Sequence, residues 1–303
     1  MNKTLRLVFL IFITQFLGFS LFATAQKEEQ GSKKPMLAVS ILPQQYFAQH
    51  IAQDLVDIVV LVGEGQNPHS YEPSPSQMAQ LAMAEAWVLS GTDFELSLTD
   101  KITSLYPNLL VVDGTLGIQF RMLEEHDHAD ESSHEENLLN IDRHTWLGWQ
   151  SSKIMVTHIK DTLVALLPEH RTVLEQNYQS LLTDIDDTFS ELQKQLAPLA
   201  GTKVFVYHPS FGYFLDEFSI MQEAVETGGK EPTAKDLSNL IEEAKKDRAS
   251  AIFVQAQFPV AAARTVAKAV GAEVVSLDPL ARDWLANIRL MGSAIHASTK
   301  EGK

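Results

Sequence analysis

Four side chains that could ligate a metal ion stand at separate places in the chain: His69, His144, His208 and Asp278. His208 follows the mainly apolar run 203–207 (KVFVY), whose β-branched and aromatic residues indicate a strand buried on both faces. Pro209 cannot donate to a sheet ladder, so we expect the strand to end at His208. In open α/β sheets, ligands bind beyond the carboxyl ends of the strands. His208 is therefore a candidate ligand. The competing interpretation is a strand-end histidine that only bonds a backbone carbonyl.

Two of the other candidates also follow predicted strands. His69 stands in a turn-rich loop after the predicted strand 56–62, and Asp278 comes directly after the predicted strand 273–277. The carboxyl ends of parallel strands share one edge of a sheet, so both side chains belong on the crevice side. For Asp278 a second interpretation is an ordinary Asp-Pro turn with Pro279 that terminates the strand.

Three imidazoles and one carboxylate match a four-coordinate zinc site, whose N and O ligands lie at about 2.0–2.2 Å. Ligands so widely separated carry no local signature comparable to HExxH, and their spacing leaves three classes of function open. The first is a metal receptor. The second is a secreted zinc hydrolase in which Asp278 or Glu72 acts as a general base rather than as a ligand. The third is a metal-buffering or adhesin-like protein that works without a transporter.

A second group of histidines lies in the segment 124–137 (EEHDHADESSHEEN), where His126, His128 and His134 stand among seven carboxylates. The segment has no apolar period and cannot bury a core, so we expect a mobile surface loop. Imidazole suits zinc, copper, nickel and iron, which indicates a loosely organised, auxiliary metal-gathering loop. The alternative is a solvated acidic loop with incidental histidines.

Composition and charge restrict the possible partners. The 303 residues are 45% hydrophobic and 21% charged, as in ordinary soluble globular proteins. The formal net charge of −15 argues against a nucleic acid as partner. The chain has no cysteine, which excludes disulfides, thiolate zinc sites, a cysteine nucleophile and a lipid-modified N-terminal cysteine.

The first 25 residues have the pattern of a secretory signal peptide. Lys3 and Arg6 are basic, 7–22 is mainly apolar, and 23–25 (ATA) fits a small-x-small cleavage site. The apolar stretch is short for a membrane span of ~20 residues, so an uncleaved anchor is the less favoured alternative. We expect a cleaved, soluble protein of the periplasm that has no lipid anchor, with a polar lead-in at 26–35.

Strand and helix patterns alternate through both halves of the remaining chain. Strands are predicted over 36–42, 56–62, 86–90 and 109–113 in the first half, and over 203–208, 218–225, 251–255 and 273–277 in the second. Helical patterns separate them, and this alternation predicts α/β lobes with mainly parallel sheets flanked by helices. We assign 36–167 to an N-terminal lobe and 199–303 to a C-terminal lobe.

A long helix is predicted between the halves, over 168–198. Its apolar positions from Leu174 to Leu196 repeat at spacings of three and four and form one stripe. At 1.5 Å per residue it would be ~45 Å long, enough to connect two lobes. A coiled-coil dimer is the competing interpretation. A single stripe of this length favours packing within the chain, so we expect a monomer.

Motifs around the four candidates carry a family resemblance. They are 67–77 (NPHSYEPSPSQ), 142–148 (DRHTWLG), 207–214 (YHPSFGYF) and 277–291 (LDPLARDWLANIRLM). The chain resembles the cluster A-I (cluster 9) solute-binding proteins, the zinc and manganese receptors of bacterial ABC importers. The resemblance runs from about residue 36 to 298 and implies a ligand set of His69, His144, His208 and Asp278. Family members usually have proline where Arg143 stands.

The resemblance also implies which metal the protein binds and which transport proteins receive that metal. The third ligand is typically glutamate in the manganese branch, so His208 resembles the zinc branch, as does the histidine-rich segment before His144. A manganese or broader divalent-metal receptor is the alternative. The family fold is two α/β lobes joined by one long helix, which limits domain movement. The resemblance implies that the partners of the protein are a membrane permease and a cytoplasmic ATPase.

The environment of the metal is expected to be closed. A site with four protein ligands leaves little room for a reactive water, so no catalytic role is expected. Three further residues are expected close to the site, either shielding it or contacting its ligands: Glu72, Trp146 and Tyr213. The alternative for these three is simple packing between the lobes.

Overall fold

The computed structural model describes residues 34–123, 140–224, 233–255, 257–258 and 261–300. The predicted signal peptide and the loop histidines His126, His128 and His134 lie outside the described residues. From Pro35 onward the chain forms one compact unit. Within the described residues, no helix has both the length and the apolar character of a membrane span.

Two four-stranded sheets, both entirely parallel, form the framework. The first has the order β2-β1-β3-β4 and the second the order β6-β5-β7-β8, so each half repeats one topology. The first sheet contains β1 (Met36–Ile41), β2 (Asp57–Val62), β3 (Ala86–Leu89) and β4 (Leu110–Asp113). The second contains β5 (Lys203–Val206), β6 (Met221–Ala224), β7 (Ala251–Gln255) and β8 (Glu273–Leu277).

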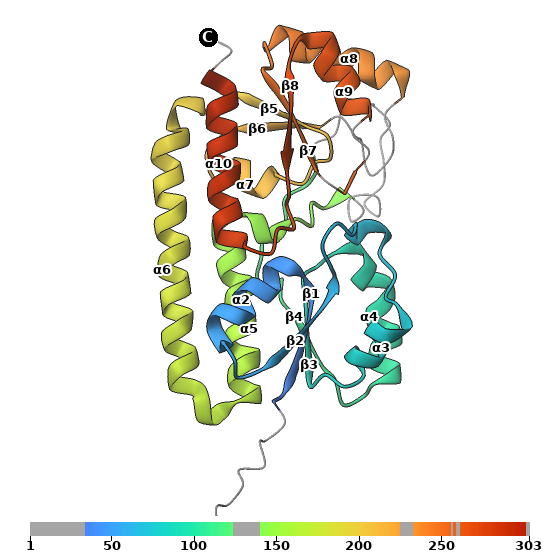
Figure 1. Cartoon of the computed structure of the whole chain (residues 1–303), viewed down its shortest axis with the longest axis vertical. Coiled ribbons are helices and arrows are strands. Elements are labelled where there is room, and N and C mark those ends of the chain that lie inside the picture. The colour runs from blue at the N-terminus through green and yellow to red at the C-terminus, as the bar shows by residue number, and fades with distance from the viewer. Residues whose placement is uncertain (1–33, 124–139, 225–232, 256, 259–260, 301–303) are drawn as a thin grey trace, which may run out of the picture. The chain divides into compact units, whose positions relative to one another are not determined.

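Helices cover both sheets, as expected for parallel strands joined by crossovers. In the first half they are α2 (Leu42–Ala52), α3 (Pro75–Leu81), α4 (Asp93–Leu105) and α5 (Trp149–Leu166). In the second half they are α7 (Gly212–Asp216), α8 (Ala234–Lys246), α9 (Ala261–Val270) and α10 (Trp284–Lys300). Between the halves lies α6 (Arg171–Leu196), which runs alongside α2, α5 and α10 (Figure 1). The predicted fold class is therefore confirmed.

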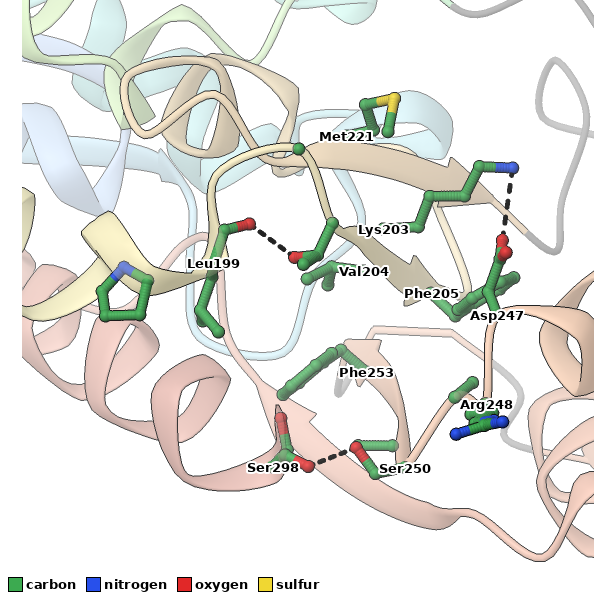
Figure 2. A pocket seen from close by; sticks show the side chains of 15 residues that line it. Leu199, Lys203, Val204, Phe205, Met221, Asp247, Arg248, Ser250, Phe253 and Ser298 are labelled. Carbon is green, nitrogen blue, oxygen red and sulfur yellow. Dashed lines mark hydrogen bonds and ion pairs between the residues drawn. The ribbon is translucent and has the colours of Figure 1, made fainter. Parts of the chain in front are cut away.

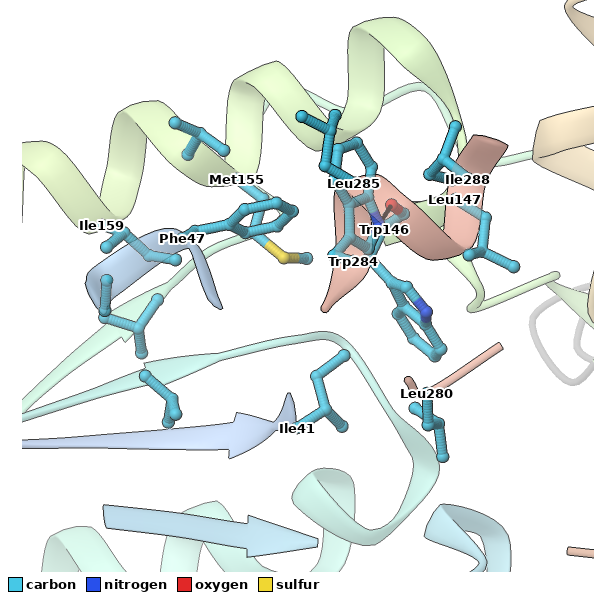
Figure 3. Packing of buried hydrophobic residues seen from close by; sticks show 14 of the residues in the cluster. Ile41, Phe47, Trp146, Leu147, Met155, Ile159, Leu280, Trp284, Leu285 and Ile288 are labelled. Atoms are coloured by element: carbon cyan, nitrogen blue, oxygen red, sulfur yellow. Dashed lines mark hydrogen bonds between the residues drawn. The ribbon is translucent and has the colours of Figure 1, made fainter. Parts of the chain in front are cut away.

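One hydrophobic core extends through both halves on the side of α6. Phe47 of α2 packs edge-on against Trp284 of α10 at 4.9 Å between ring centroids, and both rings are fully buried (Figure 3). Trp284 Nε1 donates to the carbonyl of Trp146, whose own Nε1 donates to the carbonyl of Pro279. Truncating a buried ring of this kind costs about 3–5 kcal/mol. The two halves therefore share one continuous packed core on this side of the molecule.

The predicted strands and helices differ from the observed ones mainly at their ends. Strand β5 ends at Val206, two residues before the predicted end, because the chain bends over 207–209 and a short helix follows from Gly212. That helix, α7, was not predicted from the sequence. The long helix begins at Arg171, after a 3₁₀ turn at Pro168–His170.

One hollow in the second half lies at the amino ends of its strands, away from His208. This cavity has a volume of about 440 Å³ and is lined where β5 and β7 begin, at Lys203 and Ala251 (Figure 2). Lys203 forms ion pairs there with Glu223, Glu243 and Asp247, so its charge is balanced within the protein. The two candidate ligands of the second half, His208 and Asp278, follow the carboxyl ends of β5 and β8, at the other edge of the sheet, as parallel topology predicts.

Candidate metal centre

His208 is held rigidly by the end of the neighbouring strand. Gln255, the fully buried last residue of β7, accepts a bond from the His208 N–H at 3.3 Å. Its Nε2 donates to the His208 carbonyl and to Ser210 Oγ, each at 2.7 Å. The imidazole stacks on Phe258 at 4.4 Å between ring centroids and is 5% exposed. The backbone and the ring are therefore both fixed.

His144 is equally buried and is oriented by a carboxylate. It precedes a 3₁₀ turn (Thr145–Leu147), and Asp142 Oδ1 accepts bonds from its backbone N–H at 3.0 Å and from its Nδ1 at 2.8 Å. Burial raises the pKa of Asp142, but bonds from His144 and Arg121 outweigh this and hold the pKa below its ordinary value. A fully buried, ionised carboxylate thus faces one side of the imidazole.

His69 lies on a more exposed turn. It is the central residue of the 3₁₀ turn Pro68–Ser70, whose N-cap Asn67 accepts a bond from the His69 N–H at 2.9 Å. Its Nδ1 donates to Asp93 Oδ2 at 2.5 Å, and the other oxygen of Asp93 pairs with Arg143 Nε at 2.8 Å. The hydrogen bond from His69 lowers the pKa of Asp93 against the opposing effect of burial.

The three imidazoles converge through the same ring nitrogen. His208 Nε2 lies 3.0 Å from His69 Nε2 and 3.3 Å from His144 Nε2. Two nitrogens bound to one tetrahedral zinc at 2.0–2.1 Å are ~3.3 Å apart, so the spacing fits a shared ion. Donation from Nδ1 to a carboxylate leaves the lone pair of Nε2 available for a metal. The structure thus brings together the three predicted histidines in a ligand-like arrangement.

The pocket around the three rings is very small. Its volume is about 10 Å³, roughly the space of one water molecule. The lining is mainly imidazole and apolar groups, including Trp146, which is 1% exposed and has its ring 5.4 Å from that of His144. The space between the rings therefore matches the size of a single ion or water molecule.

Asp278 lies beside the pocket rather than within the group of converging ligand atoms. Its Oδ1 accepts bonds from Gln257 Nε2 at 2.8 Å and from the Leu280 N–H at 2.9 Å. Among the described residues, the ligand atoms that lie within 4.8 Å of one another belong to the three histidines and not to Asp278. Gln257 and Leu280 both line the pocket, so the carboxylate is one residue away from it. Its role as fourth ligand stays a prediction.

The three residues predicted to surround the site have different positions. Trp146 forms part of the pocket wall. Tyr213 contacts the residue that orients His144, because its hydroxyl donates to the carbonyl of Asp142 at 3.2 Å. Burial raises the pKa of that hydroxyl to about 12. Glu72 is exposed and does not belong to the pocket lining, so its part in the site stays a prediction.

Sequence reasoning missed the carboxylates behind the histidines. Asp142 stands two residues before His144, and this D-x-H spacing was an available signal. Asp93 opens α4 just beyond a strand end, but its contact with His69 spans 24 residues and has no local signature. Arg143, which departs from the usual proline, pairs with Asp93 and so supports a ligand other than its neighbour His144.

A comparison with known protein families agrees with this geometry. A family model described as ZnuA, zinc-uptake complex component A periplasmic, matches residues 37–297. The chain belongs to this family. The resemblance to the cluster A-I solute-binding proteins, drawn from four short motifs, is thereby confirmed.

Individual relatives of this ZnuA-family chain carry related names. It is 26% identical over 264 residues to the high-affinity zinc uptake system protein ZnuA of Yersinia pestis, covering 80% of this chain and 82% of the relative. It is 28% identical over 274 residues to the zinc-binding lipoprotein AdcA of Streptococcus pneumoniae strain R6. That alignment covers 86% of this chain but 53% of AdcA, so the chain spans about half the length of that relative.

The fold is similar to a solved structure of the same family. A crystal structure of ZnuA superposes with a TM-score of 0.79 at 35% sequence identity. The superposition covers 87% of this chain and 98% of that chain. Both parallel sheets and the helix between them therefore belong to an established architecture.

Proposed function

We propose that this protein is a zinc receptor that captures Zn²⁺ between its two sheets and delivers it to a membrane ABC permease driven by a cytoplasmic ATPase. The observation that carries the proposal is the convergence of three Nε2 atoms at 3.0 and 3.3 Å, contributed by residues 69, 144 and 208. Names of family members as zinc uptake proteins support it.

Capture follows from the protonation states of the histidines. His69 and His144 each donate Nδ1–H to an aspartate, so each offers a Nε2 lone pair to an ion. The aspartates increase the basicity of the imidazoles and hold the rings in place, which strengthens binding without direct contact to the metal. Because neutral imidazole is the ligand, protons compete with zinc, and acidification favours release.

Asp278 is proposed as the fourth ligand. A carboxylate in that position would complete a closed four-coordinate site and neutralise one charge of the ion. It already stands next to the pocket, held by Gln257, whose own Oε1 is buried and makes no hydrogen bond within the described residues. A rotation of Gln257 would give up one of the two hydrogen bonds to Asp278 Oδ1 and leave room on that oxygen for the metal, with the Leu280 N–H still bound.

The donor set favours zinc over manganese. Imidazole is a good ligand for zinc, whereas manganese prefers carboxylate, carbonyl and water oxygens. A manganese receptor of the same family is therefore the alternative metal assignment. A secreted zinc hydrolase is a weaker alternative, because the sequence contains no HExxH motif. We propose that the protein is not an enzyme.

The setting of the protein completes the proposal. We infer export through the leader 1–25, cleavage after Ala25, and a soluble periplasmic receptor without a lipid anchor, since the chain lacks cysteine. We propose that it acts as a monomer with lobes at 36–167 and 199–303. Histidines 126, 128 and 134 are proposed to gather zinc weakly before it reaches the central site.

Metal analysis of the purified protein tests the proposal. After equilibration with equal Zn²⁺ and Mn²⁺, elemental analysis should give one tightly held zinc per chain. Preferential manganese binding would overturn the metal assignment, and metal-dependent hydrolysis of ester or peptide substrates would overturn the receptor. Zinc-limited growth should require the gene. Normal zinc uptake in its absence would instead indicate a buffering or adhesin-like protein.

A further inference from the structure

Arg121 lies outside the group of ligand residues and contacts Asp142, the carboxylate that orients His144. Its Nη1 donates to Asp142 Oδ2 at 2.8 Å, while the other oxygen of Asp142 receives the bonds from His144. The arginine side chain is 15% exposed and the aspartate side chain is fully buried. The carboxylate is therefore held on both sides, by a histidine ligand and by an arginine.

The same guanidinium also reaches the second half of the molecule. Arg121 Nε donates to Asp216 Oδ2 at 2.9 Å, and Asp216 ends α7, the helix that begins four residues after His208. The backbone N–H of Arg121 donates to Tyr213 Oη at 3.0 Å from the same helix. Because guanidinium presents its donors in a planar, fixed fork, it can hold two carboxylates in a defined geometry.

Gly212 shows how closely these groups are packed. A Cβ atom added there would lie 1.8 Å from Arg121 Nη1 and 2.8 Å from Asp142 Oδ2. Any side chain at the start of α7 would therefore displace the arginine from the aspartate. The absence of a side chain at position 212 is a steric requirement of the Arg121–Asp142 pair.

We propose that Arg121 is a positioning residue that sets the separation of His144 and His208 in the metal site. It acts on His144 through Asp142. It acts on the segment that carries His208 through Asp216 and α7. This inference rests on the proposed zinc-receptor function and extends it, because it assigns the spacing of two ligands to a residue that contacts neither one.

Two substitutions separate positioning from simple charge balance. Arg121→Lys keeps a positive charge beside buried Asp142, but a single ammonium group cannot reproduce the fork that binds both aspartates. Asp216→Asn leaves the Arg121–Asp142 pair intact and weakens only the contact with α7. Asp216 is 55% exposed, so this variant should fold normally. Arg121→Ala removes both contacts.

The matched control lies elsewhere in the protein. Lys153→Ala breaks the ion pair of Lys153 with Asp186, which joins α5 to α6 at 2.7 Å and has no contact with the three histidines. It removes a cation of similar exposure without touching the site. Its zinc affinity and cobalt spectrum should equal those of the wild type.

The readouts are zinc affinity by competition with a chromophoric chelator, the visible absorption spectrum of the Co²⁺ form, and the melting temperature of metal-free protein. Loss of a group that orients metal ligands weakens binding by about 10–100-fold, which we expect for Arg121→Ala. Arg121→Lys should recover the metal-free melting temperature but not the affinity or the cobalt spectrum. Asp216→Asn should lose about 10-fold or less, with a shifted cobalt spectrum.

Each outcome decides one question. If wild-type protein holds no tight zinc, the proposed function fails independently of Arg121. If it holds one zinc while Arg121→Lys and Asp216→Asn retain its affinity and cobalt spectrum, the positioning role is wrong. Should Arg121→Ala fail to fold, the other two variants still give this answer.

Discussion

The pair His144 and His208 contrasts with His69. The first two are each 5% exposed and are fixed by fully buried partners, Asp142 and Gln255. The His69 side chain is 32% exposed, and its partner Asp93 is 42% exposed. All three rings converge on one point, but two are preformed within the protein and one is presented by a surface turn.

This difference suggests a division of labour during capture and release. His144 and His208 are backed by the core that both halves share and, through Asp142 and Asp216, by the contacts of Arg121. The exposed pair of Arg282 with Glu64, which stands five residues before His69 in the sequence, also joins the two halves, and such a contact is worth little in water. We infer that the buried pair receives the ion first and that His69 closes over it.

Replacing a buried ligand should have the largest effect. His208→Ala removes one of the two preformed nitrogens and leaves a rigid gap that no other described side chain is placed to fill. We expect zinc affinity to fall by more than the ~100-fold upper range seen for residues that only orient ligands. Competition titration against a chelator measures it.

His69→Ala provides the matched comparison. The exposed position lets water replace the missing nitrogen, so affinity should fall less than in His208→Ala, with most of the change in the dissociation rate. Stopped-flow transfer of zinc to a chelator resolves that rate. Equal losses in the two variants, or a larger loss for His69→Ala, would contradict the division between a preformed pair and a closing ligand.

Acidification should weaken binding next most strongly, because each imidazole must lose its proton to bind zinc. Free imidazole titrates near pH ~6.5, so zinc retained after equilibration should decrease between pH 7 and pH 5. Equilibrium dialysis at a fixed free zinc concentration, followed by elemental analysis, measures the decrease. Unchanged zinc content at pH 5 would mean that imidazoles do not supply the main ligands.

The aspartates behind the histidines should show the same contrast on a smaller scale. Asp142→Asn should weaken zinc binding by about 10–100-fold, whereas Asp93→Asn should have a smaller effect because water reaches that carboxylate. Asp186→Asn, at a carboxylate of similar exposure to Asp93 but away from the histidines, is the control. Competition titrations of the three variants give the order, and a larger loss for Asp93→Asn would reverse the comparison.

The buried aspartate also has a signature in the metal-free protein. The pKa of Asp142 is lower in the fold than the value of about 3.9 for an unfolded chain. Its ionised form therefore stabilises the fold above that pH, and this contribution is lost as the pH falls through the folded-state pKa. The melting temperature of the wild type should converge with that of Asp142→Asn on acidification.

The framework was predictable from sequence because it depends on local patterns. Short β-branched runs such as 251–255 and 273–277 became strands with the predicted bounds, and the stripe from Leu174 to Leu196 became α6. His69, His208 and Asp278 could be placed at crevice edges for the same reason, because each follows a predicted strand, whereas His144 was a candidate by residue type and family resemblance. Their family motifs then indicated which imidazoles belonged together.

The supporting contacts were not predictable, because they join residues far apart in the chain. Arg121 pairs with Asp216 across 95 positions, and no periodicity or motif identifies that partner. Nothing in the local sequence shows that Gly212 leaves space for the guanidinium at the start of a helix. The position of Asp278 illustrates the same limit, since its strand end was correct but its bond to Gln257 depends on tertiary packing.

The smallest effect on the central site is expected from deleting residues 124–137. The ends of that segment are joined independently of it: the Leu123 N–H donates to the Asn140 carbonyl at 2.8 Å, and the Asp142 N–H donates to the Arg121 carbonyl at 2.9 Å. Because these bonds hold Asp142 and hence His144, the deletion should leave one tight zinc per chain while weaker equivalents disappear from the titration. A second variant keeps the full length of the segment and has its three histidines changed to asparagine. It separates the effect of losing the imidazoles from the effect of shortening the chain. If either variant loses the tight zinc, the loop contributes to the primary site, and the buried pair with His69 is not sufficient to bind the ion.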